Sequence, residues 1–317
     1  MPRPIFLGVV GDSAAGKTTL TRGIARLLGE SQVTRIAADD YHRYGRAQRA
    51  ERGITPLDPD CNYIDILEQH LGHLRAGEAV LKPVYRHQDG TFDEPRYVQP
   101  ATFIVVEGLL GFHTEALRDI YDVRVYLDPP EEMRRHWKVR RDCARRGYTT
   151  DEVLEELDRR EADAEVYIRP QQRYADIVIS FMPGDGGDQN HLDAKVTMRS
   201  GLLHPDLSPF VDGNGITLAE RGSETHLWVP GTILPERGAV IEEAIWDRMH
   251  FASHLRTERL GEFTVGTELH RSESLAIVQV LVLYHVVTAR AAVALGGPGT
   301  RTDREPVTPP SPAVSGH

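Results

Sequence analysis

Cysteine is the scarcest informative residue in this chain. Only Cys61 and Cys143 occur among 317 residues, and no motif connects them. Two thiols are too few for a disulfide framework, and they cannot by themselves supply the ligands of a structural zinc site. We therefore expect neither feature, and we expect both cysteines to be passive.

Long apolar runs and an excess of positive charge are also missing. No apolar run approaches the roughly 20 residues needed to cross a bilayer, and residues 1–10 lack the layout of a signal peptide. The formal net charge is −10, from 37 basic and 47 acidic side chains. Such a protein does not attract nucleic acid or anionic membrane over its whole surface, so anions must be bound locally. We expect a cytoplasmic protein with no membrane or nucleic-acid partner.

The remaining composition is that of a folded globular chain. Hydrophobic residues make up 40% and charged residues 26% of the sequence, which are ordinary values for a packed protein. A chain of 317 residues exceeds what one hydrophobic core usually organises. We therefore expect one large domain with an appendage.

Residues 5–183 alternate short β-branched runs with stretches of helical periodicity, the pattern of βαβ units and a parallel sheet. The candidate strands are Ile5–Val10, Val33–Ala37, Phe103–Val106, Val123–Leu127 and Ile177–Phe181. Their nearly continuous apolar character indicates strands covered by helices on both faces. With right-handed crossovers, this pattern predicts a doubly wound, mostly parallel α/β sheet.

A cluster of glycine and aspartate at residues 183–188 predicts a change of architecture. Short strands between residues 192 and 230, then helices near 239–255 and 272–295, predict a smaller C-terminal α+β region packed on the same sheet. The tail, residues 296–317, has almost nothing apolar to bury, so we expect it to be disordered. The expected divisions are thus 1–183, 184–295 and 296–317.

The strongest motif is a phosphate-binding loop between the first candidate strand and a helical pattern beginning near Lys17. The residues that form it are Gly11, Asp12, Ser13, Ala14, Ala15, Gly16, Lys17 and Thr18, which match GxxxxGK[ST], followed by Thr19. The glycines let backbone N–H groups point at phosphate oxygens, and the helix adds the positive end of its dipole. Lys17 is predicted to reach the β/γ-phosphates of ATP, and Thr18 to coordinate Mg²⁺. A turn that merely joins strand to helix is the alternative, and the loop indicates nucleotide binding more directly than catalysis.

Carboxylates at two strand ends predict the part of the site that binds the phosphoryl acceptor, which we call the acceptor side. Asp39 and Asp40 follow the second candidate strand, at the edge where open α/β sheets bind ligands. Phosphoryl transfer to an alcohol needs a carboxylate that orients the hydroxyl and accepts its proton. Glu107 ends the third candidate strand, where an acid can hold Mg²⁺ or contact the acceptor. A turn-forming aspartate pair and a solvent-facing glutamate are the alternatives.

A basic helix is predicted over residues 134–146, which contain six arginines and Lys138. Lys138, Arg141 and Asp142 fall at i, i+3 and i+4 and therefore share one helical face. Such a face can close over the transferring phosphate and neutralise its charge in the transition state. A solvated helix with Lys138 and Asp142 as an ordinary ion pair is the alternative.

Together these motifs resemble the phosphoribulokinase/uridine kinase family. The resemblance rests on the P-loop, residues 39–46 (DDYHRYGR), 57–59 (LDP), 82–87 (KPVYRH), 107–109 (EGL) and 141–142 (RD), in the family's order and spacing. The Tyr-x-His after Lys-Pro is more similar to the phosphoribulokinase branch than to uridine kinases. The resemblance implies a P-loop kinase that transfers phosphate from MgATP to the C1 hydroxyl of ribulose 5-phosphate. The product would be ribulose 1,5-bisphosphate, for carbon fixation in the Calvin cycle.

The resemblance also implies roles for individual residues. Asp39 would be the catalytic base, with Asp40 the weaker candidate, and Lys17, Lys138, Arg141 and Asp142 would complete the catalytic set. The residues that would bind the sugar phosphate are His42, Arg46, Tyr85, His87 and Glu107, with Arg46 suited to the 5-phosphate through its forked guanidinium. The metal ligands would be Thr18, Glu107 and Asp142. A homodimer is expected by analogy.

The sequence departs from the family pattern in two respects. Plant and cyanobacterial members have a cysteine inside the P-loop and another before the catalytic aspartate, where this chain has Ala15 and Ala37, so thiol switching should be absent. The family's Glu-Gly-Leu-His is replaced by a sequence ending in Leu110, so one imidazole is lost from the acceptor site. A uridine kinase-like or other metabolite kinase, and an inactive nucleotide-binding regulator, therefore remain alternatives.

Overall fold

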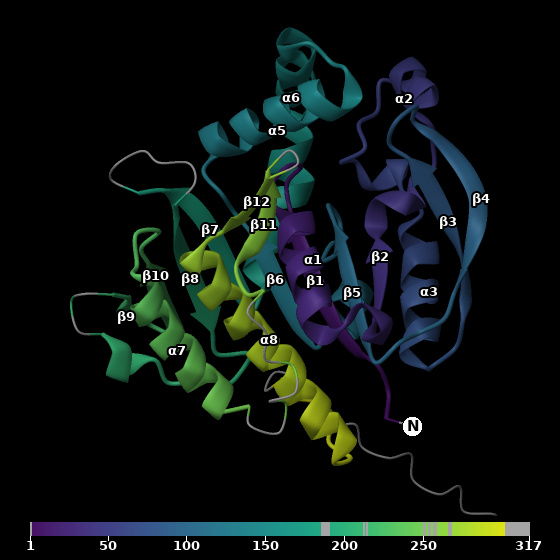
Figure 1. Cartoon of the computed structure of the whole chain (residues 1–317). Helices are drawn as coiled ribbons and strands as arrows, with labels where there is room; N and C mark the ends of the chain where they lie inside the picture. The colour runs from purple at the N-terminus through teal and green to yellow at the C-terminus, as the bar shows by residue number, and fades with distance from the viewer. Residues whose placement is uncertain are drawn as a thin grey trace, which may run out of the picture.

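One sheet of eight strands runs through the molecule in the order β2-β5-β1-β6-β7-β8-β10-β9 (Figure 1). The computed structural model describes residues 2–184, 191–211, 213, 215–249, 252, 255, 259–265 and 268–301, without the side chains of residues 145, 146 and 265. The parallel strands are β1 (Ile5–Gly11), β2 (Val33–Ala37), β5 (Phe103–Gly108), β6 (Val123–Leu127) and β7 (Ile177–Pro183). The predicted doubly wound, mostly parallel α/β sheet is therefore confirmed.

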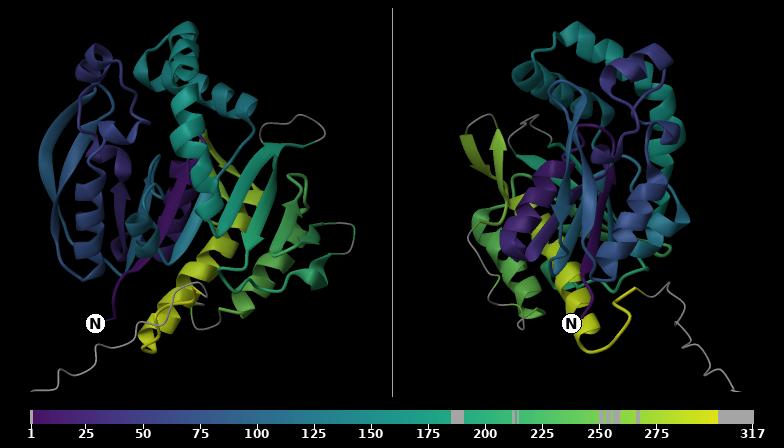
Figure 2. Two further views of the ribbon diagram at one scale, coloured as in Figure 1. Left: turned by 180° about the vertical axis from the view of Figure 1, so that it is seen from behind. Right: turned by 90° about the vertical axis from the view of Figure 1, so that its right-hand side faces the viewer.

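Helices cover both faces of this sheet, as the two views of Figure 2 show. One layer contains α1 (Lys17–Leu28), α7 (Pro235–Asp247) and α8 (Glu273–Ala294), and the other contains α3 (Ile64–Arg75) and α4 (Glu115–Ile120). Along β1 the side chains alternate between the layers. Leu7 and Val9 pack with the first, and Phe6 and Val10 pack with the second. Burial of both faces explains why this strand is apolar at nearly every position.

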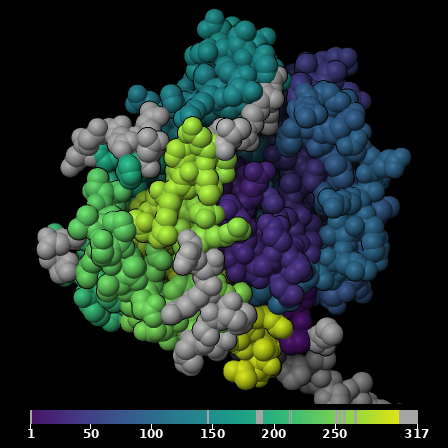
Figure 3. Space-filling model, in the orientation of Figure 1, coloured from purple at the N-terminus to yellow at the C-terminus, as the bar shows by residue number. Residues whose placement is uncertain are grey.

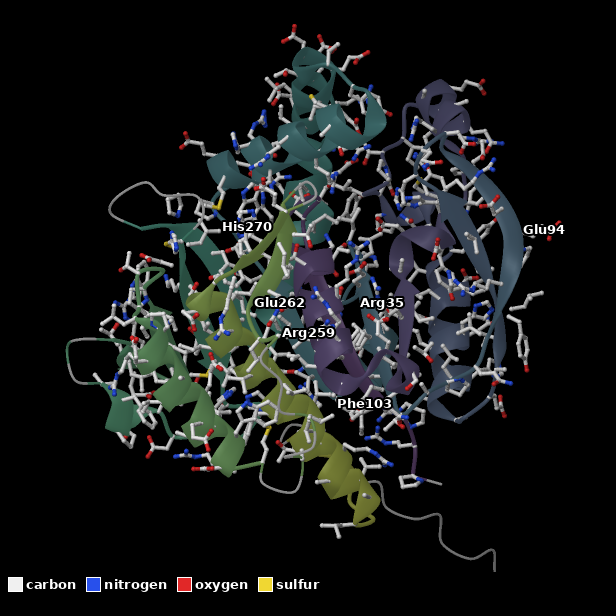
Figure 4. The ribbon with its side chains drawn as sticks, viewed as in Figure 1. Arg35, Glu94, Phe103, Arg259, Glu262 and His270 are labelled. Carbon is white, nitrogen blue, oxygen red and sulfur yellow. The ribbon has the colours of Figure 1, made fainter. Side chains whose placement is uncertain are left out.

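The C-terminal region extends the same sheet. Strands β8 (Leu192–Arg199), β10 (Glu224–Val229) and β9 (Thr217–Arg221) continue it beyond β7 by antiparallel pairing. A separate hairpin, β11 (Glu262–Val265) and β12 (Glu268–Arg271), lies against α1, where Glu262 forms an ion pair of 3.1 Å with Arg26 (Figure 4). The strands on both sides of the glycine-rich segment thus share one hydrogen-bonded framework.

The predicted disordered tail falls into two parts. Residues 302–317 lie outside the described residues. Arg301 is described, and its guanidinium lies 2.7 Å from the carboxylate of Asp176, with both side chains buried. Arg3 also donates to the carbonyl oxygen of Pro298 at 2.7 Å. The first residues of this segment therefore contact the body of the protein.

Helix α8 corrects the expectation about apolar runs. Residues 273–294 are long and apolar enough to cross a membrane by length and composition, with a mean hydropathy of 1.7 over the best window. Gln279 and His285 interrupt the run in the sequence, but both side chains are buried in the protein. In all, 72% of that window is buried, and a helix at the centre of a core meets the same criterion as a membrane span. We therefore describe α8 as a core helix that packs beside α1 in the same layer.

A second hairpin was not predicted from the sequence. Strands β3 (Val80–Arg86) and β4 (Thr91–Val98) pair only with each other, and β4 is exposed along nearly its whole length. Figure 4 shows Glu94 of β4 pointing away from the body of the protein. Helices α2 (Arg46–Arg52), α5 (Glu131–Arg146) and α6 (Thr150–Asp163) lie beyond the carboxyl edge of the parallel strands (Figure 1). These segments surround the edge that carries the motifs.

The buried carboxylate of Asp122 joins several segments at the edge of the sheet opposite the motifs. Asp122 is fully buried and accepts hydrogen bonds from the Arg3 guanidinium at 2.7 and 2.8 Å and from the Phe6 amide at 3.0 Å. Arg75 approaches the same carboxylate at 3.5 Å. Burial alone would raise the pKa of Asp122, but Arg3 and Arg75 outweigh it and lower the pKa. The ionised form is therefore part of the folded state.

We predict that Asp122→Asn lowers the free energy of unfolding by about 3 kcal/mol at about pH 7, because it leaves the half-buried guanidinium groups of Arg3 and Arg75 without their buried anion. Since the folded pKa is depressed, the ionic contribution is present above the ordinary carboxyl pKa of 3.8 and is lost as the pH falls through the lower folded value. Urea unfolding from about pH 7 to about pH 3 should show the deficit shrinking. Exposed Asp65→Asn on α3 is the control. An equal deficit at every pH would contradict the ionic explanation.

Candidate active site

The P-loop connects β1 to α1 at the carboxyl edge of the sheet. A Cβ at Gly11 would stand 2.5 Å from the carbonyl oxygen of Leu127, so only glycine fits there. Gly16 has φ +95°, and it precedes the first turn of α1. The Lys17 ammonium donates to the carbonyl oxygens of Gly11 and Asp12 at 2.7 and 2.8 Å. These two bonds hold the Lys17 side chain against the loop, where its charge can bind phosphate.

Thr18 and Glu107 lie side by side next to the loop. The Thr18 hydroxyl donates to one oxygen of Glu107 at 3.2 Å, and the Thr21 hydroxyl donates to the other at 2.5 Å. Hydroxyl and carboxylate oxygens are the hard donors that Mg²⁺ prefers. Among the described residues, no group of three or more His, Cys, Asp or Glu side chains gathers as a metal site. Thr18 and Glu107 therefore fit a magnesium ion that takes its other ligands from water and phosphate.

Asp39 occupies the 3₁₀ turn Ala38–Tyr41 that follows β2. Burial alone would raise the pKa of Asp39, but the neighbouring basic side chains of His42, His87, Lys17 and Arg141 together lower it. These side chains come from the P-loop, helix α5 and the acceptor side. The Asp39 carboxylate is therefore ionised at neutral pH and lies within the electrostatic reach of both predicted halves of the site.

Asp40 has a different position. Its carboxylate accepts hydrogen bonds from the Lys82 ammonium and from the Tyr85 backbone amide, the latter at 2.9 Å. Both donors belong to β3, so Asp40 ties the β3–β4 hairpin to the turn that carries Asp39. With its oxygens occupied in this way, Asp40 is structural.

The predicted acceptor residues come from several elements: His42 follows the turn after β2, Arg46 begins α2, Tyr85 lies on β3, His87 follows β3, and Glu107 lies on β5. The rings of His42 and Tyr85 meet edge to face with centroids 4.8 Å apart, and those of Tyr85 and His87 meet at 5.1 Å. Buried Arg49 donates to the Tyr85 hydroxyl at 2.7 Å. Arg46 donates to the carbonyl oxygens of His87 and Gln88 at 2.6 and 3.4 Å, so both terminal nitrogens of this predicted phosphate ligand contact the end of the hairpin. Figure 3 shows the purple N-terminal surface set back between this blue hairpin and the yellow-green β11–β12.

A small hollow beside Asp39 has mostly apolar walls. Its lining residues are Ala38, Asp39, Tyr41, Pro56, Asn62, Ile64, Leu67, Leu109 and Leu110. Leu110, which stands where the family has histidine, packs in a buried cluster with Leu57, Leu109 and Ile168. Leu109 and Leu110 thus form a hydrophobic wall of this hollow, where the resemblance led us to expect an imidazole.

Helix α5 carries the predicted lid residues. Lys138 donates to Asp142 at 2.9 Å, and both side chains are nearly fully buried, so this i, i+4 pair does not lie on a solvated face. Arg141 donates to the other oxygen of Asp142 at 2.8 Å. Burial opposes ionisation of Asp142, but these two cations lower its pKa to about 2. Because both of its oxygens accept from cations, Asp142 fits a metal less well than Thr18 and Glu107 do.

Four residues near the site had no predicted role: Thr21, Arg49, Asn62 and Arg134. Arg134 of α5 donates to the carbonyl oxygen of Ser13 at 3.1 Å and so joins the lid helix to the P-loop. Thr21 lies one helical turn after Thr18, and this spacing was a signal in the sequence. Arg49 and Asn62 gave no such signal, because their partners Tyr85 and His42 are distant in the sequence and are brought near only by the fold.

Known proteins are similar to this chain in sequence and in fold. The model of the Phosphoribulokinase / Uridine kinase family matches residues 6–185. A phosphoribulokinase from Synechocystis sp. is 40% identical over 183 residues, which cover 58% of this chain and 55% of that protein. A chloroplastic phosphoribulokinase from Mesembryanthemum crystallinum is 30% identical over 302 residues, covering 82% of this chain and 75% of that protein. The chain thus spans little more than half the length of the first relative.

The other branch of the family is also similar. A uridine kinase from Oceanobacillus iheyensis is 33% identical over 194 residues, which cover 60% of this chain and 90% of that protein. Among solved structures, phosphoribulokinase from Rhodobacter spheroides has a TM-score of 0.59 at 21% identity, covering 80% of this chain and 99% of that chain. The structural likeness shows a shared fold.

We predict that Lys17→Met weakens ATP binding ~10-fold and lowers turnover at least ~100-fold, because the loop loses the cation aimed at the phosphates. Burial lowers the pKa of Lys17, while Asp39, Asp12 and Glu107 oppose this shift. Calorimetric titration with ATP would measure the affinity. Lys195→Met, at an exposed position of β8, is the matched control. Wild-type affinity in Lys17→Met would exclude the predicted phosphate contact.

Proposed function

The chain belongs to the Phosphoribulokinase / Uridine kinase family of ATP-dependent P-loop kinases, and on this premise we propose that it is a phosphoribulokinase. In this proposal the γ-phosphoryl group of ATP passes to the C1 hydroxyl of D-ribulose 5-phosphate. The products are ADP and ribulose 1,5-bisphosphate. The similarity to phosphoribulokinases over 82% of the chain supports this choice.

The observation that carries the proposal is that basic side chains lie on both sides of Asp39. Lys17 and Arg141 lie on the nucleotide side, and His42 and His87 lie on the acceptor side. Lys17 and Arg141 suit the phosphates of ATP, and the Arg46 guanidinium beside His87 suits a second phosphate on the acceptor, because each phosphate needs its own positive partner. A nucleoside acceptor would carry no phosphate for the acceptor side to neutralise.

In the proposed mechanism, Asp39 accepts the proton of the C1 hydroxyl as the oxygen attacks the γ-phosphorus in line with the leaving group. Asp39 can do this without a raised pKa, since its main task is to align the hydroxyl. Lys17, Lys138 and Arg141 neutralise the charge on the transferring group. Asp142 holds Lys138 and Arg141 in place through its two carboxylate oxygens.

The acceptor would be held by His42, Arg46, Tyr85 and His87, with Arg46 directed to the 5-phosphate through its remaining N–H groups. Mg²⁺ would be held by Thr18 and Glu107, with Asp142 as the weaker candidate, and when bound would offset charge on the phosphate oxygens. The Glu107 carboxylate lies next to the Thr18 hydroxyl, so it can serve the metal without a rearrangement of the strand.

A uridine kinase-like activity is the second candidate. The hydrophobic wall formed by Leu109 and Leu110 beside Asp39 favours it, because a flat apolar base packs well on such a surface. The similarity to a uridine kinase over 60% of the chain is the other support. The Arg46 guanidinium on the acceptor side, which suits a phosphate, weighs against it.

The proposal also includes a homodimer that acts in the cytoplasm on a small sugar phosphate, without a nucleic-acid or membrane partner. Among the described strands β9 pairs with β10 alone, at one end of the sheet. Its other edge offers backbone groups to which a second copy can add a strand. The net charge of −10 supports the absence of polyanionic partners.

The first experiment compares ADP production from MgATP with ribulose 5-phosphate, uridine or no acceptor. We expect strong and selective stimulation by ribulose 5-phosphate. Stimulation by uridine would retain the family chemistry and overturn the acceptor assignment. Slow hydrolysis that neither compound accelerates would favour a nucleotide-binding regulator.

A second experiment separates Asp39 from its neighbour. We predict that Asp39→Asn lowers kcat at least ~100-fold while ATP affinity and stability change little, because alignment and proton acceptance are lost. Asp40→Asn should instead lower the melting temperature, since the tie to β3 is weakened. Near-normal turnover in Asp39→Asn would exclude Asp39 as the base.

A further inference from the structure

Asn62 lies directly behind the acceptor residue His42. The two residues form an isolated antiparallel bridge, and backbone hydrogen bonds of 2.7 and 2.8 Å flank it on both sides. Both side chains are buried, with 4% and 5% of their surfaces exposed for His42 and Asn62. Their relative position is therefore set by the backbone, and the side chains have little room to move.

The orientation of the Asn62 amide follows from its other contacts. Its Nδ2 donates to the carbonyl oxygens of Pro56 and Asp58 at 3.2 and 2.8 Å. Carbonyl oxygens only accept, so the NH₂ group must face them, and Oδ1 must face the imidazole. The distance from Oδ1 to His42 Nδ1 is 2.7 Å. Because Oδ1 has no proton to give, His42 Nδ1 must be the protonated nitrogen.

With the proton fixed on Nδ1, Nε2 is the ring nitrogen that can accept a hydrogen bond. Burial lowers the pKa of His42, Asp39 and the Asn62 bond oppose this shift, and Arg49 and His87 reinforce it. The Tyr85 ring covers one side of the imidazole. The residue behind Nδ1 is an amide, which is uncharged, and not a carboxylate that would stabilise an imidazolium. His42 is therefore neutral at neutral pH, and Nε2 carries a lone pair.

We propose that Asn62 is a positioning residue that holds His42 as the neutral Nδ1–H tautomer, so that Nε2 accepts a hydrogen bond from a substrate hydroxyl. The inference rests on the proposed kinase function and deepens it. A phosphate oxygen needs a donor, so the neutral imidazole selects the sugar part of the substrate and leaves its phosphate to cations such as Arg46. The preferred acceptor class is a polyhydroxylated sugar phosphate that carries a free hydroxyl besides the reacting one, such as the C3 hydroxyl of ribulose 5-phosphate.

The tautomer can be observed without any acceptor. Two-bond proton–nitrogen spectra of the full chain, labelled with ¹⁵N-histidine, separate protonated from unprotonated ring nitrogens, and His42→Asn identifies the signal among 14 histidines. We expect an unprotonated Nε2 and a protonated Nδ1 at about pH 7.5. An Nε2–H tautomer or a charged ring at that pH would overturn the inference. This result does not depend on the identity of the acceptor.

Kinetics of Asn62→Asp test the consequence. A carboxylate behind Nδ1–H raises the pKa of His42, so the ring becomes charged at higher pH and the acid limb of kcat/KM for ribulose 5-phosphate moves upward. Near neutral pH we expect KM for the sugar phosphate to rise ~10-fold, with KM for ATP unchanged.

Asp60→Asn is the matched control, because it changes the charge of the same turn at an exposed position. It should keep the wild-type profile. An unshifted acid limb in folded Asn62→Asp would overturn the inference. If the wild-type protein turns over no sugar phosphate, the proposed function fails, while the nitrogen spectra still decide the tautomer.

Discussion

The pairing of β5 with β1 on one side and β2 on the other is the constraint on which the site depends. In this register Glu107 stands opposite Val9 and also opposite Ala37. The P-loop starts two residues beyond Val9, and Asp39 lies two residues beyond Ala37. A shift of any strand would therefore separate Lys17, Glu107 and Asp39, which we propose as phosphate ligand, metal ligand and base. Parallel pairing brings these groups together although they are far apart in the sequence.

The parts that sequence reasoning predicted well are those in which local chemistry and global fold agree. The central strands β1 and β5 are apolar because both of their faces are buried. The P-loop motif lies between a strand and a helix, the context that its chemistry requires. Helix α7 was predicted to start near residue 239, but it begins at Pro235, a residue that suits the first turn. Helix α8 was predicted at residues 272–295 and lies at Glu273–Ala294, but the length of its apolar run was underestimated. Gln279 and His285 within this run are both buried in the core.

The parts that escaped prediction depend on long-range contacts. The β3–β4 hairpin has an exposed outer strand with a proline and charged residues, so its sequence lacks the alternation of a half-buried strand. Its place is fixed by Asp40, whose carboxylate binds Lys82 and the Tyr85 amide. Two adjacent aspartates thus have separate tasks, and only the surrounding structure distinguishes them. The contact between Asn62 and His42 is of the same kind, because it joins segments 20 residues apart.

The continuation of the sheet from β7 into β8 has a consequence for how the protein can be divided. Ile177 and Ile179 of β7 pair with Met198 and Val196 of β8, and all four side chains are buried. A fragment ending near residue 183 would expose a hydrophobic strand edge and the face of α1 that α8 covers. Exposed surfaces of this kind promote aggregation. The nucleotide-binding half is therefore not a portable module. Fusions, domain exchanges and minimal versions of this enzyme have to keep the C-terminal strands and α8 with the catalytic edge.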